Sequence, residues 1–248
     1  MKNKMKQILT FIMVVLLVPT ALFAQDNAAA ILNKMDAVLL SVKDKSADVE
    51  MQMINLKNNK TKIKKAKLLQ KGLDHKLFSY TYPKSDSGIA SLTIPGAVYL
   101  YMPMFKKPKK ITSMAESNTF NKTDFSLEDV NNKPYAERYT PKFLKNTNTN
   151  YVLDLIPKDA KDGSYSHIVV TINKQHYYPE KFEYFDKKNQ KIKEANYRFI
   201  KIGNIWVGDQ VAMKNLKKNH ETKFIMSNIK INQGLSDKLF LPENMVKK

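Results

Sequence analysis

The sequence predicts a mainly β protein, in which one domain is built on a long antiparallel sheet of about ten or eleven strands. Three observations predict this class. Apolar and polar residues alternate in many short runs, turn residues separate these runs, and only one stretch has helical spacing. A sheet of this length must curl or close to protect its edges, and an amphipathic helix can cover its inner face.

The N-terminus resembles a secretory signal peptide. A basic start, Met1–Lys6, precedes the apolar run Ile8–Val18 and the small-residue site ending at Ala24. The apolar run is shorter than the about 20 residues that span a bilayer, which disfavours the alternative of an uncleaved anchor. We therefore expect residues 1–24 to be a signal peptide, cleaved after about Ala24, and residues 25–248 to form a single exported, periplasmic domain.

The charge is strongly positive, at +19, and removal of the three leader lysines lowers it to +16. A nucleic-acid partner is disfavoured because the leader directs export and because the only arginines are Arg138 and Arg198. Base and phosphate recognition favours the planar guanidinium group. A lysine-rich surface is more typical of a solvated coat, with an anionic partner or membrane surface as the alternative.

Residues for catalysis or metal binding are scattered. The chain has no cysteine, and its four histidines do not have the spacing of a metal site. Three carboxylates lie close together, at Asp124, Glu128 and Asp129, but Thr123-Asp124 at the start of a helical turn is typical of N-capping. We expect no enzyme activity, no metal and no cofactor.

The first elements follow in order. Residues 27–42 have an apolar stripe at 3.6-residue spacing, with Asp26 or Asn27 as N-cap, and predict the helix. Alternation then places Val49, Met51 and Met53 on one face of a strand. Turn residues separate further strands expected over residues 61–71, 75–82, 89–94 and 97–102.

An irregular excursion follows Pro103 and continues to Val130. It contains a basic segment, Lys106, Lys107, Lys109 and Lys110, and ends in the run Thr123–Val130. The strands then resume, and the alternation and turns predict them over residues 135–143, 151–156, 166–172, 181–185, 192–202, 205–213 and 222–231. Such an excursion between regular elements is a typical place for function.

Several motifs resemble the outer-membrane lipoprotein-sorting protein family, which is similar to the periplasmic lipoprotein carrier LolA. The most specific is Thr123-Asp124-Phe125-Ser126-Leu127-Glu128-Asp129-Val130, which follows Tyr99-Leu100-Tyr101-Met102-Pro103 and a basic segment. Weaker matches continue in the order of the family to Leu235–Phe240, so the resemblance covers most of the mature chain. It implies a half-open antiparallel β-barrel wrapped over helices, with an apolar cavity for acyl chains and a lid.

The resemblance implies a monomeric periplasmic carrier, or chaperone, that binds acyl chains of lipoproteins or other lipids and delivers them to the outer membrane. Its partners would be an inner-membrane transporter or exporter and an outer-membrane acceptor. The alternative is a secreted structural or adhesion-type β-domain whose apolar inner face is only core. The candidate cavity and lid residues are Met51, Met53, Phe78, Tyr80, Leu92, Tyr99, Tyr101, Phe120, Phe125 and Leu127.

Two expectations concern the excursion. Phe120, Phe125 and Leu127 are predicted to cover the cavity opposite Tyr99 and Tyr101, with Phe125 half exposed when the cavity is empty. Truncation of Phe125 to Ala should then cost little stability and weaken acyl binding. The basic segment is either a solvated hairpin tip or a docking patch for an acidic donor or acceptor protein.

Overall fold

The computed structural model describes residues 27–111, 123–126, 128–130, 133–159 and 164–246. The leader and its cleavage, Phe120 and Leu127 lie outside these residues and stay predictions. The helices are α1 (Ala28–Leu40) and α2 (Tyr135–Arg138), with short 3₁₀ turns at Pro103–Phe105, Asp237–Phe240 and Pro242–Val246. The strands are β1 (Asp44–Asn55), β2 (Lys60–Lys71), β3 (His75–Tyr82), β4 (Ala90–Ile94), β5 (Ala97–Tyr101), β6 (Lys109–Lys110), β7 (Tyr139–Asn146), β8 (Asn150–Pro157), β9 (His167–Asn173), β10 (Pro179–Phe185), β11 (Lys191–Ile202), β12 (Ile205–Asn215) and β13 (His220–Ile231).

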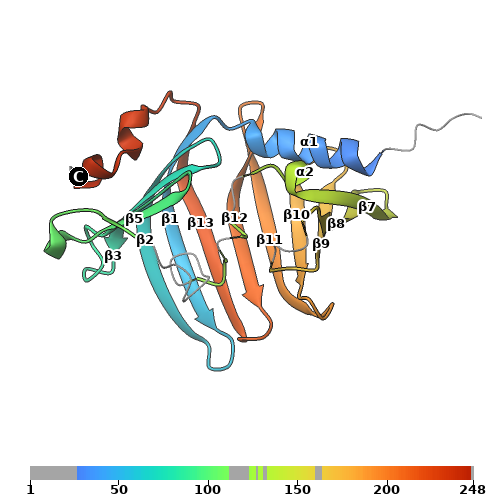
Figure 1. Cartoon of the computed structure of the whole chain (residues 1–248), viewed down its shortest axis with the longest axis horizontal. Helices are drawn as coiled ribbons and strands as arrows, with labels where there is room; N and C mark the ends of the chain where they lie inside the picture. Colours follow the sequence, from blue (N-terminus) through green and yellow to red (C-terminus); the bar gives the residue numbers. More distant parts are fainter. Residues whose placement is uncertain (1–26, 112–122, 127, 131–132, 160–163, 247–248) are drawn as a thin grey trace, which may run out of the picture.

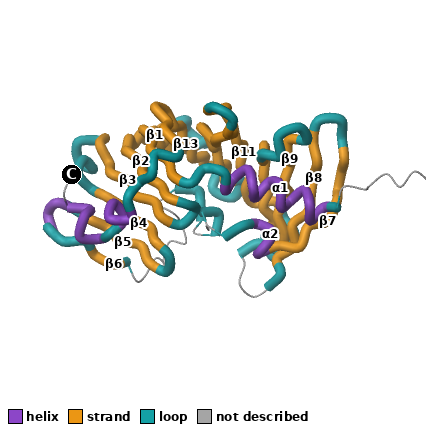
Figure 2. The backbone as a smooth tube through the Cα atoms, turned by 90° about the horizontal axis from the view of Figure 1, so that it is seen from above, coloured by secondary structure: helices purple, strands orange, loops and turns teal. Residues whose placement is uncertain are grey.

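All these strands form one antiparallel sheet, in the order β6-β5-β4-β3-β2-β1-β13-β12-β11-β10-β9-β8-β7. The sheet does not close, because β6 and β7 are its two unpaired edges. Figure 2 shows it as an arc with these edges at its ends and the helices on its concave side. The predicted class, a mainly β half-open barrel, is therefore confirmed, but the expected ten or eleven strands were too few, since the described chain has thirteen.

Helix α1 begins where the sequence predicted. The Asn27 side chain accepts a hydrogen bond of 2.9 Å from the Ala29 N–H, which caps the first turn. Ile31, Leu32 and Met35 are fully buried and belong to the main core beneath the helix. The helix runs across one end of the curled sheet, over β8 to β11 (Figure 1). No helix among the described residues is long and apolar enough to cross a membrane.

The concave side of the sheet, called the inner face below, carries the main core. Ala66 pairs with Val49 on β1 and with Tyr80 on β3, and Leu68 pairs with Ala47 and Phe78. Side chains directly opposite one another in a sheet share a face, so these rows all point inward. Val49, Met51 and Met53 are buried on that face, which confirms the predicted alternation of β1.

A second core covers the opposite face of β3 to β5. There Leu77, Ala90 and Leu92 pack against Phe240 and Met245 of the C-terminal tail. The tail begins at Ser236, whose side chain accepts from the Lys238 N–H and caps the 3₁₀ turn. Strand β3 therefore has apolar residues on both faces, with Phe78 and Tyr80 on the inner one.

Two local predictions were wrong. Residues 135–138 form a helical turn and not the start of a strand, because the Asp36 carboxylate of α1 accepts the N–H groups of Tyr135 and Ala136 at 2.9 and 2.8 Å. Asp124 is not in a helix N-terminus. Instead, Ser126 and Asp129 form the reciprocal cap, with Asp129 Oδ2 accepting from the Ser126 N–H at 2.6 Å and Ser126 Oγ accepting from the Asp129 N–H at 3.2 Å.

Candidate functional site

Two adjoining cavities lie on the inner face. The larger, of about 240 Å³, has residues of α1 in its wall, and the smaller, of about 190 Å³, has Phe125, Asp129 and Val130 in its wall. They have several wall residues in common and therefore lie next to each other. Together they reach the lower end of the range of about 300–1,000 Å³ that is usual for small-ligand pockets. The shared wall residues are Gln70, Lys76, Asp129, Val130, Tyr197, Val211 and Met226.

Apolar side chains make up most of the wall. Helix α1 and its C-terminal turn contribute Val38, Leu39 and Val42 to the larger cavity. The sheet contributes aromatic and aliphatic groups from both of its halves, at Phe78, Tyr197, Phe199, Trp206, Val211, Phe224 and Met226. Such a wall can accept a flexible apolar chain, and the Met226 thioether can adapt to its shape.

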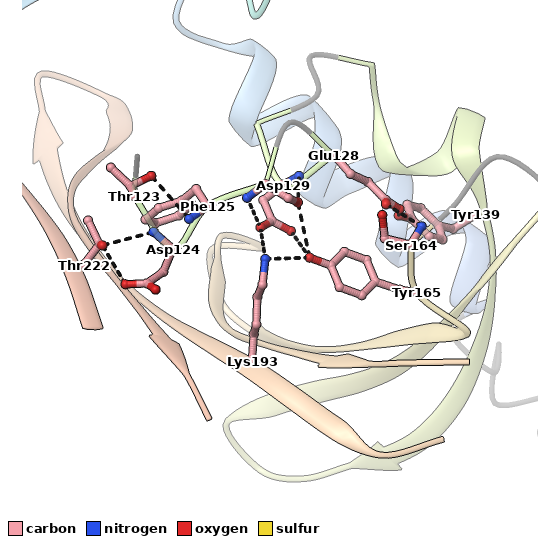
Figure 3. A network of polar contacts seen from close by, with 11 residues as sticks. Thr123, Asp124, Phe125, Glu128, Asp129, Tyr139, Ser164, Tyr165, Lys193 and Thr222 are labelled. Atoms are coloured by element: carbon pink, nitrogen blue, oxygen red, sulfur yellow. Dashed lines mark hydrogen bonds and ion pairs between the residues drawn. The ribbon is translucent and has the colours of Figure 1, made fainter. Parts of the chain in front are cut away.

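One wall of the smaller cavity is a segment of the excursion, residues 123–126 and 128–130, called the plug segment below. It lies against the inner face of the sheet (Figure 3). The Asp124 N–H donates to Thr222 Oγ1 at 3.1 Å, and Thr222 Oγ1 donates to the Asp124 carboxylate at 2.7 Å. Phe125 is 4% exposed and packs edge-to-face on Phe224, with ring centroids 5.3 Å apart. The plug segment is therefore fixed to β13.

The other end of the plug segment is fixed by a buried ion pair. Asp129 lies 2.9 Å from the Lys193 ammonium of β11, and only 1% of its side chain is exposed. The Tyr165 hydroxyl donates to the same carboxylate at 2.7 Å and accepts from Lys193 at 3.0 Å (Figure 3). Burial and the Asp129 charge raise the pKa of the Tyr165 phenol, so this hydroxyl stays a donor at physiological pH.

The carboxylates of the plug segment thus have structural partners. Glu128 accepts from the Ser164 N–H at 2.7 Å and from the Tyr139 hydroxyl at 3.4 Å. Within the described ranges, no group of three or more His, Cys, Asp or Glu residues could hold a metal ion. The arrangement of these acids supports the position of the segment.

The predicted cavity residues divide into three groups. Phe78 and Phe125 line the smaller cavity. Met51 and Tyr80 are buried in the core beside it, and Met53 is buried on the same strand face, but none of the three lines either cavity. Leu92, Tyr99 and Tyr101 belong to the second core beneath the C-terminal tail.

The predicted arrangement of a lid opposite Tyr99 and Tyr101 is therefore wrong. Leu92 pairs with Leu77 and with Tyr99, and Leu77 points away from the inner face because its neighbours Lys76 and Phe78 line the cavity. Phe125 lies on the inner face, so it does not face these tyrosines. The expected half-exposure of Phe125 is also wrong, since 4% of its surface is accessible.

Sequence reasoning missed two lysines in the cavity wall, Lys45 and Lys76. Burial lowers the pKa of Lys45 to about 8. Burial, and then the charge of Lys45, lower the pKa of Lys76 to about 8, while Asp74 acts in the opposite direction. The position of Lys45 could have been predicted from the sequence. It lies an even number of residues from Val49 and Met51 on the same strand, so its side chain must point to the same face.

The basic segment lies at the β6 edge of the sheet. Its four lysines are exposed, and the Lys109 ammonium lies 4.0 Å from the centroid of the Phe105 ring. Lysines on an edge strand hinder pairing with other chains, so this position is also suited to protecting the edge. A docking role for the segment stays a prediction.

Comparisons with known proteins agree with this architecture. A sequence model of a protein family described as "Uncharacterized protein" matches residues 72–247. An outer membrane lipoprotein-sorting protein domain from Vibrio parahaemolyticus is similar in structure, with a TM-score of 0.74, 25% identity and coverage of 89% of this chain and 98% of that domain. No curated protein matches the sequence.

Two further solved structures have the same fold. One is a DUF1329 family protein from Desulfovibrio piger, with a TM-score of 0.74, 22% identity and coverage of 86% of this chain and 95% of that one. The other is a LolA superfamily protein from Nitrosomonas europaea, with a TM-score of 0.68, 21% identity and coverage of 86% and 97%.

Proposed function

Since this chain belongs to the family matched over residues 72–247 and has the fold of the LolA-like lipoprotein-sorting proteins, we propose that it is a carrier of acyl chains. The cargo would be a lipoprotein or another lipid, taken up in the periplasm and delivered to the outer membrane. The protein would act by binding alone, without catalysis, and as a monomer.

One observation carries this proposal: two adjoining, mainly apolar cavities lie on the inner face of a sheet whose edges β6 and β7 do not pair with each other in the described part of the chain. In a closed barrel, a ligand could enter only through an end. In this sheet, α1 and the plug segment cover the inner face through side-chain contacts, and these contacts can be exchanged for an acyl chain. Each buried methylene group contributes about 0.8 kcal/mol, so the free energy of binding increases with the length of acyl chain that the cavity covers.

The alternative, a structural or adhesion-type domain, is favoured by the burial of Phe125, because the plug segment already covers part of the inner face as core. A hydrophobic fluorescent probe distinguishes the two functions. A carrier binds N-phenyl-1-naphthylamine in its native state and releases it to a long-chain lipid. A well-folded protein that does not bind the probe would refute the carrier proposal and leave the structural domain.

The cargo is best identified by mass spectrometry of lipids that co-purify with the mature protein, residues 25–248. The control is the same protein after delipidation and incubation with a cell-envelope lipid extract. Enrichment of one lipid class over its share in the extract supports selective carriage. Recovery of lipids in proportion to the extract would contradict it.

A further inference from the structure

A row of polar side chains interrupts the apolar inner face at its α1 end. Lys45 of β1 lies opposite Gln70 of β2, and Gln70 lies opposite Lys76 of β3. The next row along the same face is Ala47, Leu68 and Phe78, all of them buried. Three adjacent strands therefore place two cations and an amide side by side, directly above an apolar surface. We call Lys45 and Lys76 the lysine pair.

The lysine pair opens onto the cavity. Both side chains line the larger cavity, beside Leu39 and Val42 at the end of α1, and Lys76 also lines the smaller one. Phe125 also lines the smaller cavity, and it packs on Phe224, whose partner Met51 lies six positions along β1 from Lys45. The site thus has a cationic end and an aromatic end, as expected for an amphiphile whose polar group stays near the rim.

The two acids that the described residues contribute to the cavity wall, Asp36 and Asp129, have partners of their own. Asp36 accepts two backbone N–H groups of α2, and Asp129 is paired with Lys193 and Tyr165. Asp74 is bonded to His75 Nδ1 at 2.7 Å. The Lys45 ammonium donates a hydrogen bond to Met226 Sδ at 3.7 Å, and a thioether sulfur is a weak acceptor. Lys133, a further cation, also lines the larger cavity.

We propose that the lysine pair, with Gln70 between its members, binds one anionic group of an acyl-chain ligand, a carboxylate or a phosphate, whose chain extends along the inner face toward Phe125. Two ammonium groups offer several donors to the same anion, and charge-assisted hydrogen bonds in a half-buried site are strong. The Gln70 amide donates one N–H to the Gly72 carbonyl at 2.8 Å, and its second N–H can add to these donors. The inference rests on the proposed carrier function and adds the ligand class, an anionic amphiphile.

The depressed pKa values agree with this geometry. Burial disfavours both charges, and the charge of Lys45 further disfavours that of Lys76, but a pKa of about 8 leaves both lysines mostly protonated at neutral pH. An anion placed between them relieves the repulsion and favours the charged forms. The alternative is that the two stems line the wall while the ammonium groups reach water at the rim, with no ligand contact.

The test uses delipidated mature protein loaded with N-phenyl-1-naphthylamine, which is displaced by four compounds. These are dodecanoate and dodecyl phosphate below their critical micelle concentrations, dodecanol below its solubility limit, and inorganic phosphate. The variants are Lys45→Met with Lys76→Met, and Lys230→Met as the matched control. Lys230 is exposed on β13 opposite Ser46, and Ser46 points away from the inner face.

In the wild type and in the control, we expect the two anionic amphiphiles to compete about tenfold or more better than dodecanol. In the double variant this preference should disappear while dodecanol binds as before, and inorganic phosphate alone should not compete. Equal competition by dodecanol and dodecanoate in the wild type, or a preference that survives in the double variant, would overturn the inference but leave the carrier function. If none of the amphiphiles displaces the probe, both proposals fail.

Discussion

Replacement of Phe125 by Ala tests whether the plug segment is fixed to the sheet as the structure places it. The ring is 4% exposed and packs on Phe224, so its removal resembles a core truncation, which costs about 3–5 kcal/mol. Phe125 also lines a cavity, so part of its surface makes no packing contact that the substitution would remove. We therefore expect the free energy of unfolding to fall by about 3 kcal/mol, the lower end of this range.

For a domain of this size, about 1 kcal/mol corresponds to a shift of about 2–4 °C in melting temperature. Phe125→Ala should therefore lower the melting temperature by about 6–12 °C in differential scanning calorimetry. The matched control is Phe105→Ala, since Phe105 is 41% exposed, and this change should fall within about 1 kcal/mol of the wild type.

A double-mutant cycle with Phe224→Ala isolates the contact between the two rings. An edge-to-face aromatic pair should give a coupling energy of about 0.5–1.5 kcal/mol. If Phe125→Ala shifts the melting temperature no more than Phe105→Ala does, and the coupling energy is near zero, Phe125 does not pack on β13 and the reasoning is wrong.

Four further outcomes are expected. Asp129→Asn leaves Lys193 buried without its counter-ion and should cost about 3 kcal/mol in urea unfolding, whereas Asp186→Asn, on a more exposed ion pair, should change stability little; equal effects would contradict the buried pair. Dodecanoate affinity should fall from about pH 7 to about pH 10 as the lysine pair, with pKa values of about 8, loses its charge, and a flat profile would refute this. These pKa values lie below the ordinary value of 10.5, so between about pH 8 and pH 10.5 the unfolded chain binds more protons than the folded one. The lysine pair should therefore destabilise the fold at pH 7, and this destabilisation should decrease as the pH rises. Replacement of both lysines, Lys45→Met with Lys76→Met, should raise the melting temperature more at pH 7 than at about pH 10. Reversal of all four charges of the basic segment should slow association with an acidic partner protein and reduce its salt dependence if the segment docks, and an unchanged rate would leave it a solvated edge.

Much of the sheet could be predicted from the sequence because local rules determine it. Alternation in β1 and the turn residues after β2 and β4 need no distant partner, and their positions agree with the structure within a few residues. The turn at α2 could not be predicted in this way. Its first N–H groups bond to Asp36, which lies 99 positions earlier in the chain.

The candidate site was harder to predict because it depends on which face of each strand is inner. In β4 and β5 the apolar residues Leu92, Tyr99 and Tyr101 face the C-terminal tail, whereas the inner face of β4 carries Ser91 and Thr93, so apolar alternation indicates the side away from the cavity. This is why Leu92, Tyr99 and Tyr101 were assigned to the wrong face. The lysine pair escaped notice for a related reason, since each lysine alone is an ordinary strand-end residue and only the register across three strands brings the two together.

The pairing of the first strand with the last has a consequence for the folding of the chain. Asp48 and Asn228, which form a hydrogen bond between β1 and β13, are 180 positions apart. A ribosome must therefore have made nearly the whole protein before the two half-sheets can join at the centre. Contacts of such long sequence separation form slowly, and until they form, each half-sheet exposes an apolar inner face that is prone to aggregation.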